Sequence, residues 1–427
     1  TRSITLTTAK ESQDYYLARS PKGENYRLRL AKSGHLVGIR TTRGIRETNE
    51  DRCQASVLEF DVKEGGEKER KTSENGVESH KEGKEGQICY FAIFDGHGGA
   101  QCADYLTANL HKQIEDVRVS DADDVILRWR NVGGFRPTIL APLLSPETMQ
   151  PNTKKRTLDT GGNSGSNEHK TSRNYSSTTQ NSLMSSSSAT ELTLDQRLTI
   201  AFLKTDLELI DSIPHSVGST ATAVLIKTLD GHSFWSSQEL EITVAHVGDT
   251  RALLCDVPSG DAISLTFDHH PGAITEHDRL RKSGGYIITD SFGSEMFLGR
   301  LANSRAMGNS KMKRYGVSAE PEIVSNTVKG KDVAFMVLVS DGVTSVLSNQ
   351  EIVDCIKNHD DPTLAASKLV DLADELGSED NITAMVLIFW LQNVVTFEDR
   401  NIDNILLYVR WCACLDGDLP CLTSRKI

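Results

Sequence analysis

Carboxylates stand at the ends of several apolar runs in this chain. Asp95 directly follows the run ICYFAIF (88–94), and Asp341 follows the run VAFMVLV (333–339) after one serine. A third acid, Asp380, precedes the last apolar run, NITAMVLIFW. If these runs are strands of one sheet, the acids at their ends repel one another unless a cation lies between them. The pattern therefore predicts a cation-binding site.

Oxygen donors dominate this predicted site. Glu50 and Asp51 lie where the chain enters its first predicted strand, and the carbonyl group of Gly96 follows Asp95. Carboxylate and carbonyl oxygens are hard ligands, which favour Mg²⁺ or Mn²⁺ over zinc. Shared carboxylates suit two metal ions, which lower the pKa of water and bind the oxygens of an in-line phosphoryl displacement.

Two further side chains supply what the hydrolysis of a phosphate ester needs. Arg46 offers a bidentate guanidinium to phosphate oxygens. His97, two residues after Asp95, can donate a proton near neutral pH. Each has a structural alternative. Arg46 would then form a surface ion pair with Glu47 or Glu50, and His97 would cap the helix that follows it.

The acids also have a structural alternative. Asp-Gly after a strand is typical of a hairpin turn, although the sequence after Gly99 favours a helix rather than a second strand. In this alternative Asp95, Asp341 and Asp380 are turn and cap residues whose side chains lie far apart. The positions of the carboxylates in the fold therefore separate the two interpretations.

Hydrophobic periodicity indicates the elements that must position these residues. Short β-rich apolar runs predict strands, and apolar residues spaced by four predict helices. The segment GDT (248–250) is predicted to be a turn. Strands joined by tight turns, with helices in pairs, predict an α+β fold with antiparallel sheets and helices packed outside. The predicted strands cover 88–94, 221–228, 241–247, 251–257, 333–339 and 381–390, and the predicted helices cover 100–114, 194–210, 274–283, 350–359 and 362–376.

Composition divides the chain into one domain and several flanking segments. Residues 61–87 are charged with almost no apolar side chain, and residues 131–190 contain a Ser/Thr/Asn tract, so both are predicted to be disordered loops. Residues 37–395 are predicted to form one domain around them. Residues 1–36 are predicted to be an N-terminal extension, either a remnant of a targeting segment or a disordered basic end. No function is predicted for the tail, residues 396–427.

Bulk properties exclude several classes of function. The chain has 427 residues and a net charge of −12, which disfavours broad nucleic-acid binding. It contains no run of eighteen apolar residues, so no membrane span is predicted. The eight cysteines are scattered without a CxxC pair, which indicates free thiols in a reducing compartment rather than disulfides or a zinc site.

A series of short motifs resembles, in order and spacing, the PPM (type 2C) family of metal-dependent protein serine/threonine phosphatases. The resemblance covers roughly residues 37–390 apart from the two predicted loops. Ten ordered motifs are far more specific than any single Asp-Gly pair. The matching segments are RETNED (46–51), FDGHGG (94–99), GSTATAV (218–224), HVGDTRALL (246–254), DHHP (268–271), EHDRLRKSGG (276–285), GRLANSRAMG (299–308), SAEPEI (318–323), SDG (340–342) and EDNIT (379–383).

The resemblance implies a fold and a metal centre. The fold is a four-layer α-β-β-α sandwich, in which two antiparallel sheets are flanked by helix pairs. Two Mg²⁺ or Mn²⁺ ions are expected at one end between the sheets. By position, Asp95 matches the acid that bridges the ions. The other implied ligands are the carbonyl oxygen of Gly96 and the side chains of Glu50, Asp341 and Asp380.

The same resemblance implies catalytic roles. Arg46 matches the phosphate-binding arginine, His97 the general acid, and Asp51 the acid that orders metal-bound water. The implied substrate is a phosphorylated protein, whose phosphoserine or phosphothreonine is hydrolysed directly without a phosphoenzyme intermediate. We expect the protein to be a monomer.

Some positions depart from the family pattern. Asn309 replaces the acid that usually follows RAMG, and Thr344 and Ser345 replace a tryptophan and an acid that usually follow SDG. The missing acids belong to an accessory third metal site of the family, so a third metal of the usual kind is not expected. These losses also suggest an alternative function, a catalytically weak or inactive module that binds phosphorylated proteins.

The segments GRLANSRAMG (299–308) and SDGVTSVLSNQEI (340–352) are similar to those of mitochondrial family members. Some of those members act on 2-oxo acid dehydrogenase complexes. We therefore expect a protein of the mitochondrial matrix or intermembrane space, with such a complex as the candidate partner. The alternative location is the cytoplasm or the nucleus.

Overall fold

The structure of the protein is a computed structural model. The predicted loop at 61–87 (except Gln87), most of the predicted loop at 131–190 and the tail at 396–427 lie outside the residues that it describes. The described residues are 16–19, 25–60, 87–134, 137–145, 148, 191–282, 287–289, 295–299, 301–357 and 359–389.

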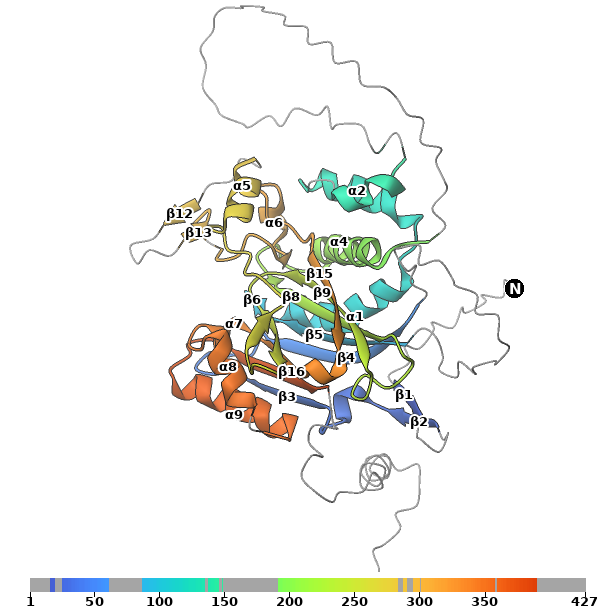
Figure 1. The fold of residues 1–427 in the computed structure, drawn as a ribbon. Helices are drawn as coiled ribbons and strands as arrows, with labels where there is room; N and C mark the ends of the chain where they lie inside the picture. Colours follow the sequence, from blue (N-terminus) through green and yellow to red (C-terminus); the bar gives the residue numbers. More distant parts are fainter. Residues whose placement is uncertain are drawn as a thin grey trace, which may run out of the picture.

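Two five-stranded antiparallel sheets lie face to face between two layers of helices (Figure 1), which confirms the predicted four-layer sandwich. The order of the first sheet is β15-β9-β8-β5-β4, and that of the second is β11-β10-β16-β17-β3. The strands of the first sheet are β4 (Arg52–Glu59), β5 (Gln87–Phe94), β8 (Ala221–Thr228), β9 (Glu239–Val247) and β15 (Glu322–Lys329). Those of the second are β3 (Val37–Thr42), β10 (Arg251–Asp256), β11 (Ala262–Ser264), β16 (Val333–Val339) and β17 (Ile382–Ile388).

Alternation along the strands explains why the sheets stack. In β5, Cys89, Phe91 and Ile93 belong to the core between the sheets, whereas Tyr90 and Phe94 belong to the core under the helices. Successive side chains of a strand point to opposite faces. A strand that is apolar on both faces therefore belongs in an inner layer, covered on both sides.

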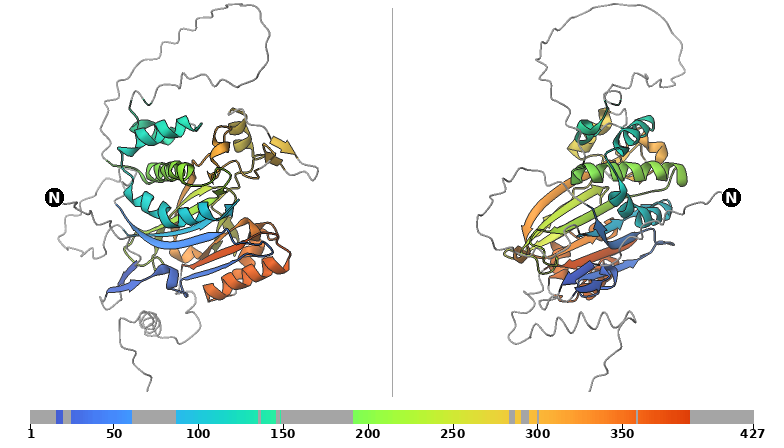
Figure 2. Two further views of the ribbon diagram at one scale, coloured as in Figure 1. Left: turned by 180° about the vertical axis from the view of Figure 1, so that it is seen from behind. Right: turned by 90° about the vertical axis from the view of Figure 1, so that its right-hand side faces the viewer.

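Helices cover the outer face of each sheet, as Figure 2 shows from behind and from the side. Several begin at capping residues that satisfy otherwise unpaired N–H groups. Thr193 and Gln196 form a capping box, and so do Ser348 and Glu351. The helices on the first sheet are α1 (Gln101–Asp116), α2 (Asp121–Asn131) and α4 (Leu194–Ser212), and those on the second are α8 (Asn349–Ile356) and α9 (Pro362–Glu375).

Antiparallel register brings the strand ends that carry the predicted site to one end of the sandwich. Arg52 at the start of β4 pairs with Phe94 at the end of β5. Val339 at the end of β16 pairs with Ala384 near the start of β17 and with Arg251 at the start of β10. Motifs that are far apart in sequence therefore converge.

Smaller elements surround this end. A three-stranded sheet has the order β14-β7-β6. A separate region carries the helix α5 and the two-stranded sheet of β12 and β13 (Figure 1). The bounds are β6 (Gly96–His97), β7 (Gly218–Ser219), β14 (Met307–Gly308), α5 (Ile274–Lys282), β12 (Ile287–Thr289), β13 (Glu295–Phe297), α6 (Ser310–Lys313), α7 (Asp341–Thr344) and the 3-10 helix η3 (Gly330–Asp332).

The prediction that residues 131–190 form a disordered loop is wrong for the start of that range. The 3-10 helix η2 (Thr138–Leu143) is ordered, and Leu140 and Leu144 are buried in the core beneath α1, α2 and α4. The side chains of Leu140 and Leu144 therefore pack this short segment against the three helices.

The predicted domain boundary at residue 37 is also wrong. β1 (Tyr16–Arg19) pairs with β2 (Asn25–Leu28), and the 3-10 helix η1 (Leu30–Lys32) follows. Tyr16, Leu28 and Leu30 are buried in the core between the sheets. The Tyr16 ring packs edge-on against Phe234 and Trp235, with ring centroids 6.2 and 5.5 Å away.

The described residues include five of the eight cysteines. Cys53, Cys89, Cys102, Cys255 and Cys355 are free thiols. In the part of the chain that the structure describes, no helix combines the length and apolar character needed to cross a membrane.

Candidate active site

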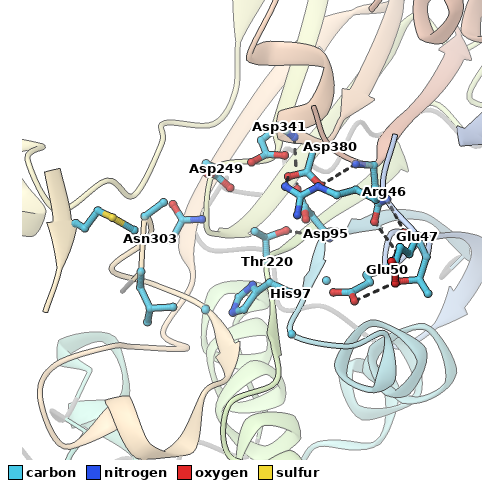
Figure 3. A pocket seen from close by; sticks show the side chains of 18 residues that line it. Arg46, Glu47, Glu50, Asp95, His97, Thr220, Asp249, Asn303, Asp341 and Asp380 are labelled. Atoms are coloured by element: carbon cyan, nitrogen blue, oxygen red, sulfur yellow. Dashed lines mark hydrogen bonds and ion pairs between the residues drawn. The ribbon is translucent and has the colours of Figure 1, made fainter. Parts of the chain in front are cut away.

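A cavity of about 510 Å³ lies where the acid-bearing strand ends converge. Figure 3 shows the side chains around it. The lining includes six acidic residues, Glu47, Glu50, Asp95, Asp249, Asp341 and Asp380, together with Arg46, His97 and the apolar residues Met296, Leu301, Ala302 and Ala306.

Three aspartates form a cluster in this cavity. One carboxylate oxygen each of Asp95, Asp249 and Asp341 lies within 4.8 Å of the other two. Asp95 follows β5, Asp249 lies between β9 and β10, and Asp341 begins α7 after β16. The structure thus brings the predicted residues Asp95 and Asp341 together, contrary to the alternative in which they are unrelated turn and cap residues.

Burial and mutual repulsion raise the pKa values of this cluster. Burial raises the pKa of Asp341 to about 7, and the charges of Asp249 and Asp380 act in the same direction. Burial also raises the pKa of Asp95 well above its usual value, and the charges of Asp341, Asp51 and Asp249 add to the effect. A divalent cation among these carboxylates would relieve the repulsion.

The donor atoms present fit a hard divalent metal. All three side chains of the cluster are carboxylates, the ligand type that Mg²⁺ and Mn²⁺ prefer. The buried Oδ1 atom of Asp341 has no hydrogen-bond partner among the described residues. Buried polar atoms are nearly always paired, so an oxygen left in this state indicates that a ligand belongs there.

Asp380 and Arg46 form an ion pair beside the cluster. Arg46 Nη2 lies 2.8 Å from Asp380 Oδ2, and Arg46 Nε donates to the carbonyl oxygen of Glu379. Arg46 therefore pairs with Asp380, and not with Glu47 or Glu50 as the structural alternative proposed. Its side chain is 55% exposed, so a phosphate group in the cavity can reach the guanidinium.

Glu50 lines the cavity apart from the three aspartates (Figure 3). Its Oε2 atom accepts a hydrogen bond of 3.0 Å from the backbone N–H of Gly99. The neighbouring Gly96 also lines the cavity, and a Cβ atom there would collide with the carbonyl oxygen of Glu50. The metal-binding roles of Glu50, Gly96 and Asp380 stay predictions.

Asp51 is buried and is not one of the residues that line the cavity. Thr383 Oγ1 donates a hydrogen bond of 2.7 Å to its Oδ2 atom. Burial raises the pKa of Asp51 to about 6 although the bond from Thr383 opposes the shift. Its predicted role in ordering water stays a prediction.

His97 lines the cavity and contacts Asn309. The His97 Nε2 atom lies 2.7 Å from Asn309 Oδ1. The N-cap of α1 is Ala100, which makes no side-chain capping bond, so the interpretation of His97 as a helix cap is wrong. The Asn309 side chain, which stands where the family pattern has an acid, is bonded to His97.

Sequence analysis missed Asp249. The segment GDT was predicted to be only a turn, and the structure does place it between β9 and β10. A signal was nevertheless present, because Asp249 also follows a buried strand, as Asp95 and Asp341 do. A turn residue can also be a ligand when the turn lies at the end of the sheet where the other acids converge.

Comparison with known proteins agrees with this geometry. The family profile described as protein phosphatase 2C matches residues 127–382. Protein phosphatase 2C homolog 4 of Schizosaccharomyces pombe is 31% identical over 86% of this chain and 84% of that protein. Protein phosphatase 1K, mitochondrial, of Xenopus laevis is 30% identical over 83% of this chain and 68% of that protein.

Solved structures share the fold at low sequence identity. A serine-threonine phosphatase 2C from Toxoplasma gondii has a TM-score of 0.51 at 19% identity, over 83% of this chain and 94% of that one. A sex-determining protein of C. elegans has a TM-score of 0.52 at 17% identity, over 85% of this chain and 67% of that one.

Proposed function

This chain belongs to the protein phosphatase 2C family of metal-dependent serine/threonine phosphatases, and we propose that two Mg²⁺ or Mn²⁺ ions at the aspartate cluster support direct hydrolysis of phosphoserine and phosphothreonine in proteins. The observation that carries the proposal is the convergence of Asp95, Asp249 and Asp341 within 4.8 Å. When bound, the ions would lower the pKa of a water molecule and neutralise charge on the phosphate.

The side chains around the cluster have separate roles in this proposal. Asp95, Asp249 and Asp341 hold the ions, with the Gly96 carbonyl and Glu50 as further donors. Asp380 is a further metal ligand that also holds Arg46 through their 2.8 Å ion pair.

Arg46 and His97 act on the substrate. The guanidinium binds two oxygens of the phosphate, a geometry that arginine forms readily. His97 gives a proton to the serine or threonine oxygen as the P–O bond breaks. Asp51 is buried and accepts a hydrogen bond from Thr383. Its proposed role is to orient the attacking water.

Phosphate release from a phosphoserine or phosphothreonine peptide tests the proposal. Activity should require added Mn²⁺ or Mg²⁺ and should be abolished in Asp95→Asn, since that change removes a ligand while keeping the size of the side chain. A wild-type protein as inactive as Asp95→Asn at saturating Mn²⁺ would contradict the proposal.

The alternative is a catalytically weak module that binds phosphorylated proteins, and it was suggested by Asn309 and Ser345. The contact of Asn309 with His97 favours the enzyme, because the amide supports the candidate acid. Calorimetric titration with Mn²⁺ separates the two. Absence of binding would favour the module.

We propose a mitochondrial location, which the name of the Xenopus laevis relative supports. The proposed partner is a phosphorylated protein, with a 2-oxo acid dehydrogenase complex as the candidate, and the proposed state is a monomer. Comparison of phosphopeptides from mitochondrial and cytosolic fractions, with and without the protein, tests this. Changes confined to cytosolic targets would overturn the location.

A further inference from the structure

We propose that Asn309 is a positioning residue for His97, which orients the imidazole ring and holds its proton on Nε2. This inference rests on the proposed function, in which His97 donates a proton to the leaving oxygen. It adds a residue of this chain to that step, at the position where the sequence departs from the family pattern.

The hydrogen bonds of Asn309 determine which way its amide faces. Asn309 Nδ2 donates to the carbonyl oxygen of Ser216 at 3.2 Å. A carbonyl oxygen only accepts, so the amide nitrogen must face Ser216 and Oδ1 must face His97. Because Oδ1 also only accepts, the Nε2 atom of His97, at 2.7 Å, is the donor. In the neutral ring, Nδ1 is then the nitrogen without a proton.

The small sheet of β14, β7 and β6 brings the two side chains together. His97 pairs with Gly218, and Gly218 pairs in turn with Gly308, the residue before Asn309. A Cβ atom on Gly218 would collide with both Asn309 Oδ1 and His97 Nε2. Glycine between the two strands is therefore what permits the contact.

Buried charges fix the backbone that carries Asn309. The N–H group of Gly308 donates to Asp206 Oδ1 at 2.7 Å. Asp206 forms a fully buried ion pair of 2.8 Å with Lys313, whose Nζ also donates to the carbonyl oxygen of Ala306. The residues on either side of Met307 are thus held by one ion pair, which leaves Asn309 little freedom to move away from His97.

The backbone of Asn309 itself suits this residue type. Its φ and ψ are 48° and 45°, in the left-handed region where asparagine, aspartate and glycine are favoured. Its N–H group donates to the carbonyl oxygen of Val217 at 2.9 Å. Two substitutions can therefore change the side chain without straining the backbone, and they form a matched pair.

To act as an acid, His97 must carry a second proton, on Nδ1, and this is the proton that it delivers, because the Nε2 proton is bonded to Asn309. In the hydrolysis a water oxygen forms a bond to phosphorus, the P–O bond to serine breaks, and the serine oxygen takes the proton of His97. One proton of the water stays on the phosphate product, and the other is released to solvent, from which His97 is protonated again. A serine oxygen needs that proton, whereas 4-nitrophenolate is stable without it. The two leaving groups therefore report separately on the orientation of His97.

The test compares Asn309→Gly, which removes the amide, with Asn309→Asp, which keeps an acceptor oxygen. With a phosphoserine peptide and saturating Mn²⁺, kcat of Asn309→Gly should fall roughly 10-fold or more. With 4-nitrophenyl phosphate its kcat should change less than about 2-fold. Asn309→Asp should restore most of the peptide activity. Equal losses on both substrates, or no loss on the peptide, would overturn the inference.

Nitrogen-15 chemical shifts of the histidine rings give a second readout that needs no turnover. The metal-free wild-type protein should show His97 with its proton on Nε2, and Asn309→Gly should show a mixture of both forms. The same spectrum in both proteins would overturn the inference. A wild-type protein inactive on both substrates would instead contradict the proposed function, and the spectra would still decide the role of Asn309.

Discussion

Two buried clusters of acidic side chains in this protein are built in opposite ways. Glu276 in α5 forms ion pairs with Arg279 and Arg305 at 2.6 and 2.7 Å. At the cavity, the charges that act on Asp95 are those of other acids, Asp341 and Asp51 among them. The charge of Glu276 is neutralised by two arginines of the chain. The charge of Asp95 is opposed by the charges of other acids.

The pKa values record this difference. Burial alone would raise the pKa of Glu276, but the hydrogen bonds and charges of Arg305 and Arg279 outweigh it and hold the pKa well below its usual value. Burial and like charge act together at Asp341, where the pKa rises to about 7.

The contacts of each cluster explain what it does. Arg279 also bonds to the carbonyl oxygens of Gly316 and Ser304, so the Glu276 cluster ties α5 to two other segments. Buried acids that are fully paired within the chain hold elements together. Acids that are left to repel one another indicate a site for a ligand from outside.

The largest effect is expected where the unpaired cluster is broken. Asp341→Asn should lower kcat/KM for a phosphopeptide by roughly 10³-fold or more, because it removes a charged oxygen from the proposed metal centre. Initial rates over a range of Mn²⁺ concentrations measure this. Recovery of full activity at high Mn²⁺ would show that Asp341 is not needed beyond its contribution to affinity.

Breaking the paired cluster should instead cost stability. Glu276→Gln leaves two largely buried arginines without their carboxylate and should lower the free energy of unfolding by roughly 3 kcal/mol. Urea unfolding measures the change. Asp354→Asn, at the exposed pair with Lys357, is the control and should leave the midpoint unaltered. If both variants unfold alike, the Glu276 cluster has no structural role.

The two clusters should respond to pH with opposite signs. The pKa of Asp341 is raised from 3.8 to about 7 in the folded protein. Between these two pH values the metal-free folded protein therefore binds more protons than the unfolded chain. Its stability should therefore fall as pH rises from 5 to 8, by roughly 2 kcal/mol relative to Asp341→Asn. Glu276, with a lowered pKa, stabilises the fold above its usual pKa, and this contribution is lost only as the pH falls below that value.

Thermal unfolding with and without Mn²⁺ checks this prediction. Metal ions compete with protons for the same carboxylates, so Mn²⁺ should raise Tm more at pH 7.5 than at pH 5.5. The same increase at both pH values, or none in wild type, would contradict it.

The smallest effect concerns Asp249, the acid that sequence analysis missed. Asp249→Asn should weaken Mn²⁺ binding by about 10-fold, measured by calorimetry, since two aspartates of the cluster remain. Thr250→Ser, at the next position, is the matched control and should bind Mn²⁺ like the wild type. Unchanged affinity in Asp249→Asn would place Asp249 outside the metal centre.

The residue pattern predicted antiparallel sheets with helices outside and two of the three clustered acids for a physical reason, whereas the four-layer arrangement was implied by the family resemblance. Asp95 and Asp341 follow long apolar strands. This pattern can be recognised from neighbouring residues in the sequence alone. Asp249 lies in a turn between two strands, where an acid is common without any ligand. Its role depends on the register that sets β9 and β10 beside the other strand ends, and this register pairs residues that are distant in the sequence, such as Arg251 and Val339.

Local composition also concealed parts of the core. The first 36 residues carry more basic than acidic side chains, so Tyr16, Leu28 and Leu30 did not stand out. Each is buried only because a distant segment provides a surface for it. Similarly, nothing near Asn309 in the sequence indicates His97, since the small sheet that joins them consists of two-residue strands.

The hairpin of β1 and β2 has a practical consequence for anyone who shortens this protein. Tyr16 forms one wall of the aromatic group around Phe234 and Trp235. A truncation that starts at residue 37, where the recognisable motifs begin, would expose these rings to solvent and promote aggregation. Expression of the catalytic unit should therefore begin before Tyr16.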